Sequence, residues 1–251
     1  MVQRPIHKLG PSGLTAGFDD LADESVITMY CGDDVVVRLL ATPQDLEDLA
    51  IGHIACEDRG NIDSIIVQGT NILMNGSIKP RPKDDLLTAA CGACTTGDIE
   101  IPNNFVSHSV KTKISPKDFI NSITKNQPIF DACGGVHAAA LFTTEGELKF
   151  IREDIGRHNA LDKVVGAAIK SNFEVNKSIL VLSGRMGWEL VAKALRVEIE
   201  LIFSIGAISS GAERLARASG MTLVGFACKE VPYVVGPAFR IIDKPSKEGE
   251  D

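Results

Sequence analysis

The sequence predicts an α/β protein, in which a smaller N-terminal α+β part precedes an α/β domain with a mostly parallel sheet. In the second half, short apolar runs alternate with helical patterns. The runs lie at 179–182, 199–205 and 222–226, and the helices between them at 188–197 and 212–219. Short apolar strands between helices are typical of a parallel sheet that is covered on both faces. The first half instead shows two hairpin patterns around one helix.

The first half begins with residues 1–24, a polar, glycine-containing stretch that we expect to form a loosely held arm. Strands rich in β-branched residues follow in pairs, at 25–30 with 35–40 and at 62–68 with 71–74. Between the pairs, Thr42-Pro43-Gln44-Asp45 predicts the start of a helix that runs to Glu57, with Thr42 as its N-cap. Residues 25–78 are therefore expected to form a small α+β domain.

Residues 79–109 form the predicted connection between two domains, since 79–83 is basic, broken by proline and poorly suited to regular structure. Residues 110–251 are expected to form the α/β domain. Its first helix runs from the cap Ser115 to about Lys125, and a hairpin pairs 138–143 with 147–151. Two further N-caps are expected, at Asp154 for a helix spanning 156–171 and at Ser210 for the last helix.

The composition of the 251-residue chain, with 44 % hydrophobic and 24 % charged residues, is that of a globular protein in water. No apolar run reaches the roughly 20 residues that a membrane helix needs, and we expect no secretory signal. Six cysteines without regular spacing favour a reducing, cytoplasmic location. The formal net charge of −7 argues against nucleic acid as a partner.

The sequence Cys91-Gly92-Ala93-Cys94 is the first candidate for chemistry. Two thiols at this spacing lie within reach of each other, and small neighbours leave them accessible. One thiol can then act as a nucleophile while the other resolves it, or both can hold a soft metal. The spacing alone leaves a coincidental pair or half of a zinc site as open as a reactive pair.

Three stretches of the second half indicate a binding site. Gly134-Gly135 before His137 lets backbone amides approach a ligand. Arg157 and His158 lie at a helix start, where a phosphate is favoured. Arg185, in Ser183-Gly184-Arg185, follows a strand at the end where α/β sheets bind ligands. The plainer alternatives are an ordinary turn with a structural histidine and a solvated helix start with local ion pairs.

Together with the thiol pair, these stretches resemble one family, the formate dehydrogenase accessory sulfurtransferases (FdhD/NarQ). The segments that carry the resemblance are Ala41–Gly52, Cys91–Cys94, Gly134–Ala139, Arg152–Lys163, Ser183–Arg185 and Leu223–Phe226. The resemblance implies a cytidine-deaminase-like fold for the C-terminal α/β domain and a homodimer. It also implies that the protein takes persulfide sulfur from a cysteine desulfurase, and that this sulfur is required for formate dehydrogenase activity.

The sulfur acceptor implied by the resemblance is a molybdenum or tungsten bis-pterin guanine dinucleotide, bound as a substrate rather than as a permanent cofactor. Cys91 is the implied persulfide carrier and Cys94 its partner, while no residue is assigned to a resident metal. The implied cofactor-binding residues are Gly134, Gly135, His137, Arg157, His158, Arg185, Phe226, Ala227, Cys228, Lys229, Glu230 and Val231. The arginines and the glycine amides suit phosphate groups.

The chain departs from the family pattern at four places, the first being Gly52-His53-Ile54 in place of a Gly-Phe-Leu type of helix end. Cys133 stands where members often have threonine, which gives a possible extra thiol. Gly206-Ala207-Ile208-Ser209 replaces a Ser-Ala-Pro-Thr type of loop. Phe226–Val231 aligns poorly with the family's C-terminal cofactor segment.

Two other functions compete with that of a sulfur carrier. A cofactor chaperone would bind the pterin dinucleotide and formate dehydrogenase without using its thiols. A zinc hydrolase of the deaminase type would take ligands from Cys91, Cys94 and Cys133 or His137, but the sequence lacks the His-x-Glu motif of those enzymes.

Overall fold

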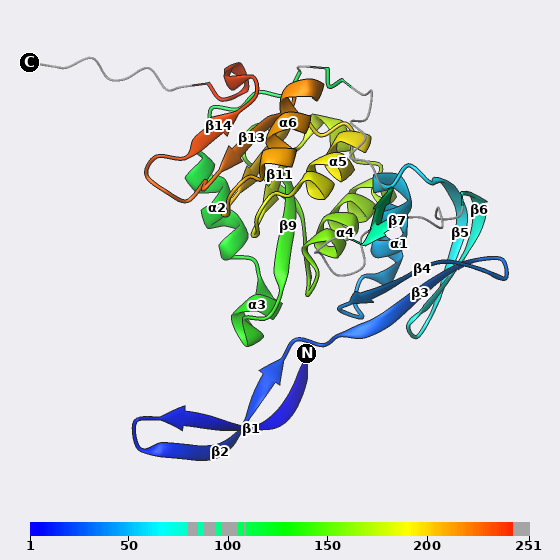
Figure 1. Ribbon diagram of the computed structural model, residues 1–251, viewed down its shortest axis with the longest axis vertical. Helices are drawn as coiled ribbons and strands as arrows, with labels where there is room; N and C mark the ends of the chain where they lie inside the picture. The colour runs from blue at the N-terminus through cyan, green and yellow to red at the C-terminus, as the bar shows by residue number, and fades with distance from the viewer. Residues whose placement is uncertain (80–84, 88–93, 97–104, 108, 243–251) are drawn as a thin grey trace, which may run out of the picture.

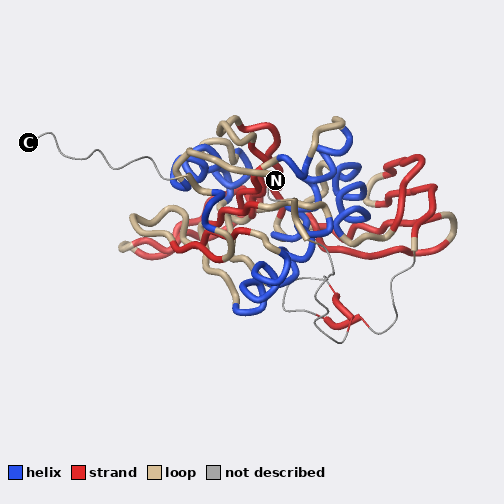
Figure 2. The backbone as a smooth tube through the Cα atoms, turned by 90° about the horizontal axis from the view of Figure 1, so that it is seen from above, coloured by secondary structure: helices blue, strands red, loops and turns tan. Residues whose placement is uncertain are grey.

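The computed structural model describes residues 1–79, 85–87, 94–96, 105–107 and 109–242, and only the backbone for 85–87 and 94–96. These residues form a six-stranded sheet, a four-stranded sheet and two separate two-stranded hairpins. Figure 2 shows the two larger sheets at opposite ends of the body, with helices between them. The candidate site lies on the six-stranded sheet.

The six-stranded sheet is mixed. Its order is β10 (Leu148–Asp154), β9 (His137–Phe142), β11 (Ile179–Leu182), β12 (Leu201–Ser204), β13 (Thr222–Gly225) and β14 (Tyr233–Val235). Only β11–β12 and β12–β13 pair in parallel, whereas β9 runs antiparallel to both neighbours and β14 antiparallel to β13. The prediction of a mostly parallel sheet was therefore wrong. The reversals arise because short connections without a crossover helix join β9 to β10 and β13 to β14.

Helices cover both faces of this sheet (Figure 1). Phe119, Ile120 and Ile123 of α2 (Pro116–Thr124) pack on one face, against Phe142 and Phe203. On the other face lie α4 (Arg157–Lys170), α5 (Trp188–Arg196) and α6 (Ser210–Ser219). Alternate residues of β9 enter the two cores, as a strand buried on both faces requires. No helix in the described part of the chain is long and apolar enough to cross a membrane.

The four-stranded sheet has the order β4 (Asp34–Ala41), β3 (Ser25–Cys31), β6 (Asn71–Ile78) and β5 (Gly60–Gln68). Its strands agree with the two predicted hairpins, and β3 and β6 pair in parallel at the centre. The helix α1 (Leu46–Cys56) packs Leu49, Ala50 and Ile54 on one face of this sheet. The result is the α+β arrangement that the sequence predicts, with the other face of α1 left for contacts with α4.

The N-terminal segment, which the sequence predicts to be an arm, is a regular hairpin. Its strands β1 (Val2–Gly10) and β2 (Gly13–Leu21) pair along their whole length and belong to no larger sheet. The hairpin projects away from the body (Figure 1). Other elements that the sequence did not predict are α3 (Pro128–Cys133), β14, η1 (Val175–Lys177), η2 (Ala238–Arg240) and the hairpin of β7 (Asp85–Leu87) with β8 (Cys94–Thr96).

Three predicted N-caps were wrong. The residue before α1 is Asp45, with a left-handed φ of 51°, and Thr42 is buried four residues before the helix. Asp154 ends β10, and Gly156 precedes α4. Ser209 rather than Ser210 caps α6, because its Oγ accepts a hydrogen bond from the Ala212 N–H at 3.2 Å. Thr42 and Asp154 instead contact each other across the domain junction.

Candidate functional site

The candidate site lies along one edge of the six-stranded sheet, where β10, β11, β12 and β13 end. Because β9 is antiparallel to β10 and β11, its first residue, His137, is opposite Asp154 and lies at the same edge. The connections after the strands carry Arg157, Arg185, Gly206 and Phe226. This is the edge at which open α/β sheets bind ligands.

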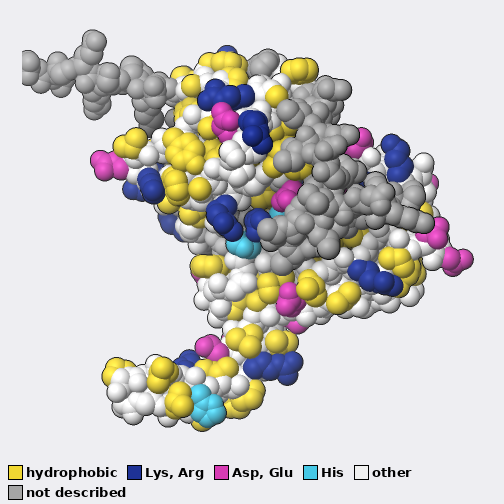
Figure 3. Space-filling view, viewed as in Figure 1, with side chains coloured by type: hydrophobic (Ala, Val, Ile, Leu, Met, Phe, Trp, Pro, Cys, Tyr) yellow, Lys and Arg dark blue, Asp and Glu magenta, His cyan; other side chains and the backbone are white. Residues whose placement is uncertain are grey.

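His137, Arg157 and Arg185 come together at the centre of this edge. A Cβ placed on Gly184 would lie 3.3 Å from His137 Nδ1 and 3.9 Å from Arg157 Cδ, so the glycine permits their close approach. Burial lowers the pKa of His137, and the charges of Arg157, His158 and Arg185 lower it further. Figure 3 shows basic and histidine side chains gathered near the middle of this face. The edge therefore offers cationic groups beside a neutral imidazole, a combination suited to an anionic ligand.

The backbone of this edge is tightly fixed by two serines. Ser183 Oγ accepts a hydrogen bond from the Ala138 N–H at 2.8 Å. Ser204 Oγ donates to the Gly184 carbonyl and accepts from the Gly206 N–H at 3.0 Å. A Cβ on Gly206 would lie 2.9 Å from Arg185 Cα, so no larger residue fits there without displacing the arginine. The cationic groups are thus carried on a preorganised backbone.

His158 is buried behind the edge. Its Nε2 lies 3.2 Å from Oε2 of Glu189, in the first turn of α5. The structure thus places His158 against a carboxylate of the neighbouring helix and close enough to His137 to affect its pKa. The ring itself lies beneath the surface of the edge.

The Phe226–Val231 segment lies at the far end of the edge, after β13. Phe226 has a left-handed φ of 51°. The centroid of its ring lies 5.6 Å from the Tyr233 ring centroid and 3.7 Å from Lys229 Nζ. The Tyr233 hydroxyl accepts a hydrogen bond from the Ile208 N–H at 2.9 Å. Ala227 is buried, and the following four residues, Cys228, Lys229, Glu230 and Val231, are exposed. This segment presents an aromatic ring and a cation next to the 206–209 loop.

Gly134 and Gly135 lie at the opposite end, where α3 leads into β9. Gly134 has φ 65° and ends α3, a conformation that favours glycine. Both glycines are exposed, and a Cβ on Gly135 would lie 3.1 Å from the Cβ of Ala22, at the root of the N-terminal hairpin. Cys133 Sγ donates to the Ile129 carbonyl at 3.1 Å. The sheet edge thus brings every predicted cofactor-binding segment into one row.

The predicted thiol pair, Cys91 and Cys94, lies largely outside the described residues. Cys91 lies outside the described residues, and only the backbone of Cys94 is described, as the first residue of β8. Among the described residues, Cys31, Cys56, Cys133 and Cys228 are free thiols. The same residues contain no cluster of three or more His, Cys, Asp or Glu side chains arranged to hold a metal.

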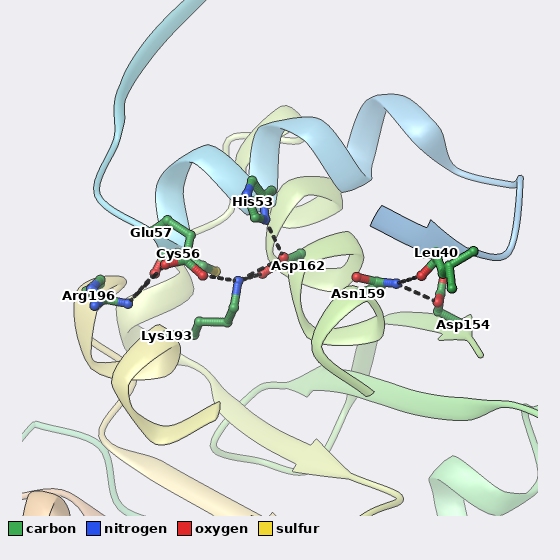
Figure 4. A network of polar contacts seen from close by, with 9 residues as sticks. All are labelled: Leu40, His53, Cys56, Glu57, Asp154, Asn159, Asp162, Lys193 and Arg196. Carbon is green, nitrogen blue, oxygen red and sulfur yellow. Dashed lines mark hydrogen bonds and ion pairs between the residues drawn. The ribbon is translucent and has the colours of Figure 1, made fainter. Parts of the chain in front are cut away.

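A buried polar network joins α1 to α4 and α5, and sequence reasoning missed it (Figure 4). Lys193 Nζ donates to both oxygens of Asp162 at 2.9 Å and lies 2.7 Å from Glu57 Oε1. His53 Nδ1 lies 3.1 Å from Asp162 Oδ2. His53 lies in α1 and Glu57 at its end, whereas Asp162 lies in α4 and Lys193 in α5. The charged residues of this network lie within helical sequence patterns, which gave no signal of a buried contact.

The charges of this network set its protonation. Burial raises the pKa of Asp162, but Lys193 and His53 outweigh burial and the net shift is downward. The pKa of the buried Cys56 thiol is raised well above its ordinary value, first by burial and then by the charge of Asp162. The junction therefore holds a stable ion pair and an unreactive thiol.

Comparison with known proteins places the chain among related sequences. A protein of Picrophilus torridus named sulfur carrier protein FdhD is 36 % identical, over 81 % of this chain and 83 % of the relative. Another of that name, from Sulfolobus acidocaldarius, is 33 % identical over 91 % of each chain. The crystal structure of a candidate formate dehydrogenase accessory protein from Desulfotalea psychrophila is 25 % identical. It superposes with a TM-score of 0.78 over 96 % of this chain and 99 % of its own. Residues 22–242 match the FdhD/NarQ family, and the chain therefore belongs to that family.

Proposed function

We propose that this protein is a sulfur carrier that accepts persulfide sulfur from a cysteine desulfurase and passes it to a molybdenum or tungsten bis-pterin guanine dinucleotide. The sulfurated cofactor is then used by formate dehydrogenase. The names of the relatives support the sulfur-carrier role, and the name of the structural neighbour supports the link to formate dehydrogenase. The observation that carries the proposal is the row of cationic and glycine-rich segments along one sheet edge.

The proposed chemistry begins with a thiolate of Cys91. It attacks the outer sulfur of the donor persulfide, a new S–S bond forms on Cys91, the donor S–S bond breaks, and the donor cysteine leaves as its thiolate. No external oxidant is needed, because the transferred sulfur keeps its oxidation state. Cys94 can release the sulfur by attacking the inner atom, which gives a Cys91–Cys94 disulfide and hydrosulfide. A cellular thiol must then reduce that disulfide.

The proposed role of the sheet edge is to bind the dinucleotide substrate. Arg157 and Arg185 carry positive charge toward phosphate oxygens, and the first turn of α4 adds its N–H groups. His137 is neutral near pH 7 because its pKa is lowered, so its ring can donate or accept a hydrogen bond. The Phe226 ring and Lys229 at the end of the row suit the guanine base.

The test of this function is intact-mass analysis after incubation with a cysteine desulfurase and cysteine. We expect a gain of one or more sulfur atoms that a reductant removes. The gain should be lost in Cys91→Ala and should persist in Cys228→Ala, which removes an exposed thiol outside the pair. Absence of any gain in the wild type, with an active desulfurase alongside, would contradict the carrier function.

A cofactor chaperone that does not use its thiols is the second candidate. It would rely on the cationic and glycine-rich segments of the sheet edge alone, which the same geometry supports. The two functions separate in a formate dehydrogenase maturation assay with Cys91→Ala/Cys94→Ala. A chaperone would keep its activity in this double variant, whereas a carrier would lose it while still binding the dinucleotide.

A further inference from the structure

We propose that Thr42 and Asp154 are positioning residues for the anion site at the start of α4, so that the small domain helps to build the site of the large one. This inference rests on the proposed binding of the dinucleotide at the sheet edge. Neither residue belongs to the row of groups that face the ligand. Both are fully buried at the junction of the domains.

Asp154 is the central residue of this arrangement, because its two oxygens bond in different directions. Oδ1 accepts from the Gly156 N–H at 2.8 Å and from Asn159 Nδ2 at 3.0 Å, both at the start of α4. Oδ2 accepts from the Thr42 N–H at 3.0 Å and lies 2.6 Å from Lys163 Nζ. One carboxylate therefore connects the first turn of α4 to the strand end of the small domain.

Thr42 completes the connection from the other side. Its Oγ1 accepts a hydrogen bond from the Ile155 N–H at 3.1 Å, and its carbonyl accepts one from Lys163 Nζ at 2.9 Å. Asn159 Nδ2 also donates to the Leu40 carbonyl at 2.8 Å. Figure 4 shows Leu40, Asp154 and Asn159 together at one end of the junction, where β4 meets the start of α4.

The segment held in this way ends at the residue that faces the ligand. The N–H groups of Ile155 and Gly156 are both bonded to Thr42 or Asp154, and Arg157 follows directly. Fixing these peptides sets the direction of the first turn of α4, and with it the N–H groups and the arginine that would meet a phosphate. A small displacement of such groups weakens binding strongly, because charge-assisted hydrogen bonds depend on geometry.

Asp162 offers a matched control, because it forms another buried polar contact between the same two parts of the chain. Asp162 lies in the second turn of α4, is buried, and is bonded to Lys193 and to His53 of the small domain. It therefore joins the same two domains through the same kind of contact, but it has no bond to residues 154–157. Asp162→Asn should lower stability without changing the site.

The test compares Thr42→Val, Thr42→Ser and Asp162→Asn with the wild type, using guanosine diphosphate as the probe in calorimetric titrations. Valine keeps the shape of Thr42 but removes the acceptor for the Ile155 N–H, whereas serine keeps it. We expect binding about tenfold weaker in Thr42→Val, as for the loss of one well-placed hydrogen bond. Thr42→Ser should restore it to within about twofold, and Asp162→Asn should bind within about twofold of wild type despite a lower melting temperature.

A second measurement does not depend on the ligand. Amide hydrogen exchange at residues 155–158 should be faster in Thr42→Val than in either Thr42→Ser or Asp162→Asn. Equal exchange and equal guanosine diphosphate affinity in Thr42→Val and the wild type would overturn the positioning role. Failure of the wild type to bind the probe would instead count against the proposed function, while the exchange rates would still decide what Thr42 holds.

Discussion

Gly52 of α1 and Gly166 of α4 bring the two helices into backbone contact. A Cβ on Gly52 would lie 1.7 Å from the Asp162 carbonyl oxygen, and a Cβ on Gly166 would lie 1.9 Å from that of Asp48. Neither distance leaves room for a methyl group, so the glycines set how closely the small domain meets the large one. The polar network of the junction depends on this spacing.

Substitution of Gly52 or Gly166 by alanine should therefore destabilise the protein by about 3 kcal/mol, the upper end of ordinary overpacking, because the clash is with backbone atoms. Urea unfolding followed by circular dichroism would measure the change. Gly17→Ala in the N-terminal hairpin is the control, since no atom lies within 4 Å of its added Cβ. A Gly52→Ala protein as stable as the control would contradict the close packing.

Loss of the Lys193 charge should have a comparable effect for a different reason. Lys193→Met leaves the carboxylates of Asp162 and Glu57 without their cation at a buried position, which costs about 3–5 kcal/mol. Lys177→Met removes an exposed partner of Glu174 and should change the unfolding free energy by less than about 0.5 kcal/mol. Equal effects of the two substitutions would show that burial of the Lys193 pair contributes nothing.

Acid should weaken the protein through a defined set of carboxylates. The pKa values of Asp162, Glu57 and Glu200 are all lowered in the fold, where Lys193 holds the first two charged and hydrogen bonds from Ser107 and the 109–110 backbone hold the third. A lowered pKa means that the unfolded chain binds the proton more readily. Their stabilisation is therefore complete above about pH 5 and is lost as the pH falls below the unfolded pKa values near 4. Urea unfolding at intervals from pH 7 to pH 3 should show this decline, with a shallower slope in Glu200→Gln. An equal slope in that variant would exclude Glu200 from the set.

The neutral state of His137 gives a test of the binding edge. We expect its titration, followed by NMR of the ring protons, to have a midpoint below 6.5, because burial and three nearby cationic groups oppose protonation. A bound phosphate would partly cancel those charges and raise the pKa. Binding of guanosine diphosphate should then take up protons and strengthen as the pH falls from 8 to 6. His137→Gln should remove the part of this dependence that exceeds the titration of the phosphate itself, and an unchanged dependence would place the anion elsewhere.

The thiols of the described residues should differ widely in reactivity. Cys228 is exposed, whereas Cys56 is buried with a raised pKa. We expect iodoacetamide at pH 7.5 to modify Cys228 in the folded protein and Cys56 only after unfolding. Peptide mass spectrometry would assign the sites. Rapid labelling of Cys56 under native conditions would mean that the junction opens frequently.

The sequence predicted most of the regular elements, because each has a strong local pattern. The two hairpins of the small domain, α2, and the alternation from β11 to β13 all agree with the structure. The direction of strand pairing could not be predicted as well. The hairpin pattern of β9 and β10 and the apolar run of β11 do not indicate that β9 and β11 become neighbours in the sheet. Parallel pairing was inferred from the helices α5 and α6, which connect β11, β12 and β13. The helix α4 also connects two strands of the same direction, β10 and β11, but β9 lies between them.

Two of the three caps were mispredicted because a residue that suits a helix start has a long-range partner. Thr42 and Asp154 both match the pattern of an N-cap, yet each hydrogen-bonds to the other across more than a hundred residues. Local sequence cannot reveal such a pair. The candidate binding segments stood out because glycine, arginine and histidine are unusual next to strand ends, and their binding role stays a prediction. The junction network was missed because its charged residues lie within helical patterns that suggest an ordinary surface.

The reversed direction of β9 determines where the sheet edge can accept insertions in the sequence. In an all-parallel sheet, every segment along the ligand edge leads from a strand into a crossover helix, so its length is limited by helix packing. Residues 134–136 reach the edge from the opposite side, since they precede β9 rather than follow a strand. Insertions at this point would leave the crossovers from β11 to β13 unaltered. A change of length at residues 134–136 should therefore leave the loops that carry Arg157 and Arg185 with their geometry.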